Sequence, residues 1–126
     1  MRLLVDTHLL LLWLSDDKRL PRSARALIAD GKNDVFVSAA SLWEIAIKSA
    51  LGRLELRYER LDAAMHANRL IELPITGRHA ARTASLPYHH HDPFDRMLVA
   101  QSLVEPLNLL THDKTLAQYS STVMLV

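Results

Sequence analysis

Four acidic residues fall where the sequence predicts that a strand ends or a helix turns: Asp6, Glu44, Asp95 and Asp113. Asp6 directly follows the apolar run 3–5, and Asp113 comes two residues after the run 109–111. If both runs are parallel strands, the two carboxylates lie at the sheet edge where open α/β folds bind their ligands. Converging carboxylates repel one another unless a divalent cation holds them, and oxygen ligands favour Mg²⁺, for which Mn²⁺ can substitute. We therefore expect metal-assisted hydrolysis of a phosphodiester bond.

Three of these acids also have a purely structural interpretation. Asp6 is a suitable N-cap for the helix that follows it. Glu44 follows Ser41 by three residues, a capping-box spacing, and precedes Lys48 by four, a helical ion-pair spacing. Asp113 fits a loop or the cap of a final helical turn. Taken singly these acids do not identify a site, whereas their joint placement at one sheet edge does.

Asp95 is the acid for which a functional role is favoured most. Asp92 and Pro93 predict the start of a helix whose dipole both acids complement. Asp95 shares a face of that helix with Leu98 and Val99, and the helix is apolar on most sides. A buried carboxylate without a partner is costly, so we expect Asp95 to have one.

Length and composition narrow the class of protein. The 126 residues, of which 49% are hydrophobic, predict one domain over 1–126 with a sizeable core. Cysteine is absent, which excludes disulfides, thiolate zinc sites and cysteine nucleophiles. No apolar run approaches the ~20 residues that cross a bilayer, and Asp6 argues against a signal peptide. We expect a cytoplasmic protein that does not associate with membranes.

The charge balance permits a polyanionic substrate without demonstrating one. The formal net charge is only +1. Outside the four acids, however, ten acidic residues remain against fifteen basic ones, and eleven of the basic residues are arginine. Arginine makes forked contacts with phosphate oxygens.

Strand-like and helix-like segments alternate along the chain. Strands are expected over 2–5, 34–38, 71–75, 107–111 and 122–126. Helices are expected over 8–14, 21–30, 41–51, 58–70, 76–86 and 93–105. Pro74 places its strand at an edge. The alternation predicts an α/β fold, a three-layer α/β/α sandwich around a mostly parallel central sheet.

Four blocks of sequence carry the acids in a recognisable order. They are Leu-Val-Asp-Thr-His (4–8), Ser-Ala-Ala-Ser-Leu-Trp-Glu-Ile-Ala-Ile-Lys (38–48), His-Asp-Pro-Phe-Asp-Arg-Met-Leu-Val-Ala-Gln (91–101) and Leu-Leu-Thr-His-Asp (109–113). These blocks resemble the motifs of PIN-domain nucleases, and most closely those of VapC-type toxins from type II toxin–antitoxin pairs. The resemblance runs over essentially the whole chain.

The resemblance implies a PIN-like fold and an endoribonuclease that is inhibited by a VapB-like antitoxin and forms a homodimer. It also implies a set of metal-binding acids: Asp6, Glu44, Asp95 and Asp113, with Asp92 in a secondary role. We expect Asp6 and Asp95 to bind Mg²⁺ directly. Glu44 and Asp113 would hold water molecules or a second ion, and Glu44 is also a candidate to accept a proton from the attacking water.

Polar residues near the acids are harder to assign. Hydroxyls at Thr7, Ser38 and Thr111 could support the acids through hydrogen bonds or simply cap helices and end strands. Arg96 could meet an RNA phosphate or lie on the surface.

The histidine run 89–91 suggests zinc, but consecutive side chains cannot easily turn towards one ion. We therefore expect a flexible, partly solvated loop at the entrance of the active site, with no assigned role for His89, His90 or His91.

The run 9–14 is more apolar than one helix face requires. About half of it should be core. The remainder, with Leu51, Leu54 and Leu56, could form an exposed patch for a partner.

Two alternatives belong to other classes. A signalling receiver domain also binds Mg²⁺ at aspartates on a parallel sheet, but the strand 34–38 ends without an acid. In such a domain Glu44 and Asp95 would have no role. A non-catalytic module of the same fold, with structural acids, is the second alternative, because fold alone does not establish function.

Overall fold

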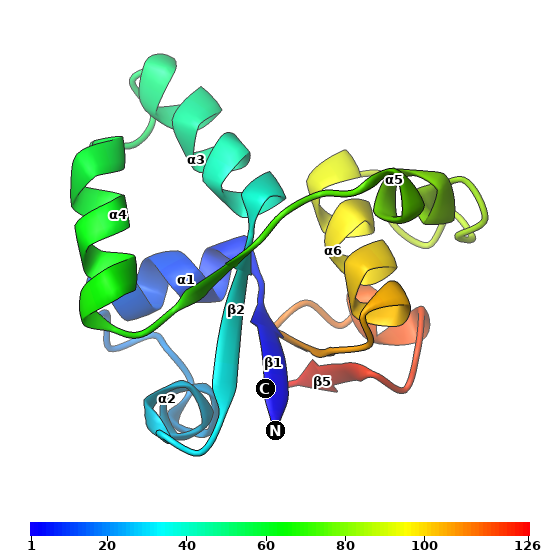
Figure 1. The fold of residues 1–126 in the computed structure, drawn as a ribbon, viewed down its shortest axis with the longest axis horizontal. Helices are drawn as coiled ribbons and strands as arrows, with labels where there is room; N and C mark the ends of the chain where they lie inside the picture. The colour runs from blue at the N-terminus through cyan, green and yellow to red at the C-terminus, as the bar shows by residue number, and fades with distance from the viewer.

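The computed structural model describes residues 1–126. Its strands are β1 (Arg2–Val5), β2 (Asp34–Ser38), β3 (Ile71–Leu73), β4 (Asn108–Thr111) and β5 (Val123–Leu125). Its helices are α1 (Thr7–Leu14), α2 (Arg22–Ala29), α3 (Ala39–Ala50), α4 (Tyr58–Ala67), α5 (Gly77–Thr83), α6 (Pro93–Val104) and the 3-10 helix η1 (Leu116–Gln118). Helices α1 to α4 lie on one side of the sheet and α5 and α6 on the other, which confirms the three-layer sandwich (Figure 1).

All five strands are parallel and follow the order β3-β2-β1-β4-β5. Strand β1 is central and pairs with β2 on one side and β4 on the other. The chain first builds the sheet from β1 through β2 to β3, and then returns to the other side of β1 for β4 and β5. The direction of building therefore reverses between β1 and β4, and open α/β sheets bind ligands at such a point.

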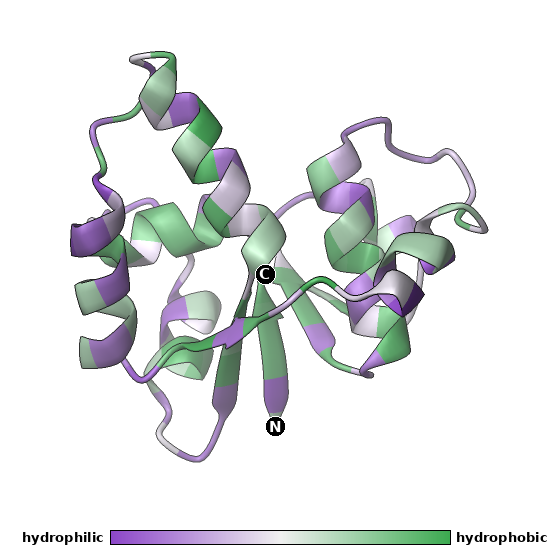
Figure 2. Ribbon diagram, turned by 45° about the horizontal axis from the view of Figure 1, so that its top comes forward, coloured by the Kyte–Doolittle hydropathy of each residue, from purple (hydrophilic) through white to green (hydrophobic).

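Both faces of the sheet are buried, as expected for parallel strands. Successive side chains alternate between the faces, so Leu3 and Val5 enter the core beneath α1 to α4, whereas Leu4 enters the core beneath α6. Figure 2 shows central strands that are hydrophobic along most of their length and hydrophilic at one end. The first residues of β1 and β2 are the exposed Arg2 and Asp34. Polar side chains are therefore found at the ends of the strands rather than on the faces of the sheet.

The predicted elements are present, with differences at their ends. Helix α3 begins at Ala39 rather than Ser41, because the Ser38 hydroxyl already accepts a hydrogen bond from the backbone N–H of Ala40 at 3.0 Å. The helix expected over 76–86 ends at Thr83. Strand β3 lies at an edge, as Pro74 predicts. None of the helices combines the length and apolar character that a membrane span requires.

Candidate active site

Two of the predicted acids lie at the point where the sheet reverses direction. Asp6 follows β1 and Asp113 follows β4, and these strands are direct neighbours with Val5 opposite Leu110. The pairing continues one residue further, because the backbone N–H of Asp6 donates to the carbonyl of Leu110 at 3.1 Å. The strand ends thereby bring together two acids that are far apart in the sequence.

Asp6 both caps a helix and contributes a carboxylate to the acid cluster. One carboxylate oxygen accepts the backbone N–H of Leu9 at 2.8 Å, which caps α1 as predicted. The other accepts the hydroxyl of Thr111 at 2.5 Å. The residue is only 6% exposed, and this burial raises the pKa of Asp6 despite both hydrogen bonds. A buried carboxylate of this kind favours a nearby cation.

Asp95 enters the cluster from α6. Asp92 caps this helix as predicted, since its Oδ1 accepts the backbone N–H groups of Phe94 and Asp95 at 2.8 and 3.2 Å. Asp92 is therefore occupied as a cap, in line with its secondary role. Burial, and then the negative charge of Asp92, raise the pKa of Asp95 to about 7, with smaller effects from Asp6 and Glu44. The environment of Asp95 thus also disfavours an unpartnered negative charge.

Asp113 is held by its own loop. Its Oδ1 accepts the backbone N–H of Thr115 at 2.8 Å, and its backbone N–H donates to the hydroxyl of Thr111 at 3.0 Å. Thr111 therefore supports both strand-end acids, donating to Asp6 and accepting from Asp113. Of the two interpretations of Thr111, the supporting one is correct.

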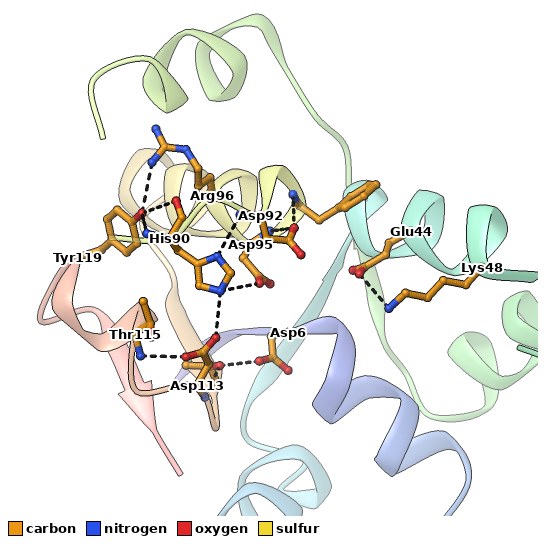
Figure 3. Close-up of polar contacts among 12 residues, drawn as sticks. Asp6, Glu44, Lys48, His90, Asp92, Asp95, Arg96, Asp113, Thr115 and Tyr119 are labelled. Atoms are coloured by element: carbon orange, nitrogen blue, oxygen red, sulfur yellow. Dashed lines mark hydrogen bonds and ion pairs between the residues drawn. The ribbon is translucent and has the colours of Figure 1, made fainter. Parts of the chain in front are cut away.

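Glu44 faces the other acids from α3 (Figure 3). Its carboxylate lies 3.1 Å from the ammonium of Lys48, so the predicted helical ion pair is present. The predicted capping box with Ser41 is wrong, because Ser38 caps α3 and Ser41 is buried, accepting the hydroxyl of Thr7 at 2.8 Å. The hydroxyls of Thr7 and Ser38 therefore position helices and make no hydrogen bond to any of the four acids.

His90 is the site residue that the sequence did not reveal. Its Nε2 lies 3.2 Å from Asp113 Oδ2 and 3.4 Å from Asp95 Oδ2 (Figure 3). Of the histidine run, His89 and His91 are exposed, whereas His90 is only partly solvated, with its side chain 23% exposed. Its position two residues before the helix cap Asp92 is the only signal in the sequence that places it near Asp95.

Arg96 takes neither of its two expected roles. It is buried, and its guanidinium donates to the carbonyl oxygens of Thr83, Leu86 and Pro87 at 2.9, 3.2 and 2.8 Å. The guanidinium also lies over the ring of Tyr88, with Cζ 4.2 Å from the ring centroid. Arg96 therefore uses its donors to hold the end of α5 and the segment that follows it.

The group as a whole suits a hard divalent cation. Asp95 and Asp113 each place one oxygen within 4.8 Å of the imidazole of His90. Asp6 lies outside this group, but Thr111 contacts both Asp6 and Asp113. Burial and mutual repulsion raise the pKa of Asp6 and of Asp95. Both causes of the shift would be offset by a cation bound among these oxygens.

Comparison with known proteins gives a family for this fold. The sequence matches the PIN domain family model over residues 3–121. Among solved structures, VapBC2 from Rickettsia felis, bound to a DNA fragment from their promoter, is similar at 13% identity with a TM-score of 0.70, covering 100% of this chain and 98% of that chain. FitAcB from Neisseria gonorrhoeae is similar at 18% identity with a TM-score of 0.58, covering 90% and 89%. No curated protein sequence matches. The family model spans nearly the whole sequence, and the chain belongs to the PIN domain family.

Proposed function

We propose that residues 1–126 form a single nuclease domain, a Mg²⁺-dependent endoribonuclease that serves as the toxin of a type II toxin–antitoxin pair. The observation that carries this proposal is the convergence of Asp6, Asp95 and Asp113, from three separate elements, where the sheet of a PIN domain reverses direction. The receiver-like alternative lacks support, because β2 ends in Ser38 rather than in an acceptor aspartate.

Mg²⁺, for which Mn²⁺ can substitute, fits the oxygen donors of this cluster. Asp6 and Asp95 would hold the ion directly, and Glu44 and Asp113 would hold its water molecules or a second ion. When bound, the metal lowers the pKa of water and stabilises negative charge on the phosphate.

The chain itself supplies fixed positions for its carboxylates. Asp6 is held from both sides by Leu9 and Thr111, and Asp113 is held by Thr115. Such preorganisation reduces the cost of gathering like charges around a substrate. Glu44 stands apart on α3, tied to Lys48, and is the acid that we assign to accept a proton from the attacking water.

Cleavage of single-stranded RNA by the purified protein tests this function. We expect activity with Mg²⁺ or Mn²⁺, none after chelation, and a fall of ~100-fold or more in Asp6→Asn and Asp95→Asn. Asp62→Asn, on the exposed face of α4, is the matched control and should keep full activity. Activity that survives chelation, or that both site variants retain, would contradict the mechanism.

Sequencing the ends of cellular RNA cut after brief expression would identify the target.

An antitoxin requires an apolar surface near the acids. Helix α1 buries Leu9, Leu10 and Leu12, whereas Leu11 and Leu14 are only partly buried. A cavity of about 350 Å³ opens beside them, lined also by Leu54 and Leu56. His8 lines this cavity close to Asp6, so a bound peptide could extend from the cavity towards the acids. Co-purification with a VapB-like protein encoded beside this chain, and loss of that complex in Leu54→Glu, would test this partner.

A homodimer is proposed on the exposed face of α3. Trp43, Ile47 and Leu51 recur every four residues and are all exposed, with Trp43 62% exposed. An apolar cavity of about 500 Å³ adjoins Trp43 and is also lined by Ile75, Tyr88 and Phe94. Exposed apolar patches of this kind mark interfaces. Sedimentation should show a dimer for the wild type and a monomer for Ile47→Glu, and a wild-type monomer would contradict the proposal.

A further inference from the structure

The imidazole of His90 is placed as if it belonged to a metal site. Its Nε2 lies within 3.4 Å of both Asp95 and Asp113, and the side chain is 23% exposed, so it can be reached from solvent. Distance alone would therefore make His90 a nitrogen ligand beside two carboxylates. The contacts of the other ring nitrogen lead to a different assignment.

The tautomer of His90 follows from its own loop. The backbone N–H of Asp92 donates to Nδ1 of His90 at 3.0 Å. Nδ1 must therefore offer a lone pair, and in the neutral ring the hydrogen is on Nε2. A histidine that binds a metal through Nε2 carries its hydrogen on Nδ1 instead, and that hydrogen would meet the N–H of Asp92. The observed contact thus favours a donor at Nε2 and opposes ligation there.

The loop is held so that this ring cannot easily reorient. The hydroxyl of Tyr119 accepts the backbone N–H of His90 at 2.8 Å and donates to its carbonyl at 3.3 Å. The same hydroxyl accepts a hydrogen bond from Arg96 at 3.2 Å, which occupies its bonding capacity. Buried Arg96 therefore fixes Tyr119, and Tyr119 fixes the backbone of His90 (Figure 3).

We propose that His90 is a substrate-binding residue, which presents its Nε2–H to a phosphate oxygen of the RNA and does not bind the metal. This inference rests on the proposed function. The Nε2–H faces the carboxylates of Asp95 and Asp113. When a cation engages those carboxylates, the donor becomes available to the nearest anionic oxygen, which is that of the substrate. The structure thus assigns the metal to the acids and one phosphate contact to the imidazole.

Three measurements on the whole protein test this assignment. The ¹⁵N spectrum of the imidazole in metal-free wild type should show hydrogen on Nε2 and none on Nδ1. Titration with Mn²⁺ should give affinities for His90→Ala within about twofold of wild type, because no ligand is lost. Single-turnover cleavage should slow by ~10- to 100-fold in His90→Ala, the value of one hydrogen bond to a charged group, with partial rescue in His90→Gln, whose amide also donates. His91→Ala, an exposed neighbour in the same loop, is the matched control and should cleave normally.

Other results would overturn the assignment. A tenfold or greater loss of Mn²⁺ affinity in His90→Ala, or hydrogen on Nδ1, would make His90 a ligand. Active wild type with equally active His90→Ala would show that the donor is not used, while leaving the proposed function intact. Wild type that cleaves no RNA would instead overturn the proposed function, and the substrate contact with it.

Discussion

Two histidines of this molecule share the same local arrangement in different parts of the fold. Nδ1 of His79, on α5, accepts the backbone N–H of Thr76 at 3.0 Å. Nδ1 of His90, before α6, accepts the backbone N–H of Asp92 at the same distance. In each case the contact assigns the ring hydrogen to Nε2, and that nitrogen faces a carboxylate.

The surroundings of Nε2 distinguish the two rings. His79 is 1% exposed, and its Nε2 meets one carboxylate oxygen, of Glu105, at 2.5 Å. Nε2 of His90 faces both Asp95 and Asp113 at longer distances and in partial contact with solvent. The first pair matches one donor with one acceptor. The second leaves more negative charge than its donor can balance, so it can still bind a cation or an anion of suitable geometry.

The same local chemistry therefore stabilises the fold in one place and remains open to ligands in the other. A satisfied buried pair resists change because either partner alone would lose its hydrogen bond. An unbalanced cluster destabilises the ligand-free protein and gains when a ligand arrives. Four experiments separate these two cases.

Removing His79 should have the largest effect. His79→Ala would leave a cavity and deprive Thr76 and Glu105 of their partners, so we expect the free energy of unfolding to fall by about 2–4 kcal/mol. His90→Ala, where solvent can replace the ring, should cost less than about 1 kcal/mol. Urea unfolding measures both. Equal losses in the two variants would show that the pairs do not differ.

Added Mg²⁺ should raise the stability of the protein through the cluster of Asp95, Asp113 and His90, and not through the His79–Glu105 pair. At a concentration of about 100 times its Kd, the ion would stabilise the wild type by about 2.7 kcal/mol, seen as a rise in Tm. Asp95→Asn should show a smaller rise, whereas His79→Gln should show the wild-type rise from a lower starting Tm. A chelator should reverse the effect. Equal shifts in wild type and Asp95→Asn would argue against metal binding by this cluster.

The metal-free protein should become less stable as pH rises through the pKa of Asp95. That pKa is about 7 in the folded protein, against the ordinary aspartate value of 3.8 in the unfolded chain, so the folded state binds more protons between these values. The stability that this group contributes is therefore fully present below about pH 4 and is lost as the pH rises from about 4 to about 7. At pH 8 Asp95→Asn should stabilise by about 1 kcal/mol, reduced by solvent screening. Thermal unfolding of both proteins at pH 5 and pH 8 measures this, and an unchanged pH dependence in the variant would contradict it.

Breaking the ion pair of Glu44 should have the smallest effect. Lys48 is nearly half exposed, so Lys48→Ala should change the free energy of unfolding by less than about 0.5 kcal/mol. Lys48→Met keeps the length of the side chain and controls for packing. A loss above 1 kcal/mol would show that the Glu44–Lys48 ion pair stabilises the fold, as the buried His79–Glu105 pair does.

Much of the fold follows from short-range pattern. The apolar run before Asp6, the cap at Asp92 and the edge position marked by Pro74 each depend on neighbouring residues, and each was predicted correctly. The proximity of Asp6 and Asp113 was also predicted from the sequence, because the carboxyl ends of parallel strands lie at the same end of a sheet.

What escaped prediction depends on long-range contacts. Nothing in a run of three histidines shows that His90 alone turns inwards, because Tyr119, 29 positions later, holds its backbone. The role of Arg96 was not predicted, because its carbonyl partners belong to the last residue of α5 and to the segment after it, whose path the sequence does not define. Ser41 looked like a cap until the end of β2 placed Ser38 there.

The acid cluster also orders events during synthesis. Thr111 donates to Asp6 across 105 positions, and β1 precedes β4 along the chain. A nascent chain that has not yet formed β4 has Asp6 without Thr111 or Asp113 beside it. On the proposed function, a product truncated before β4 therefore carries no complete nuclease centre.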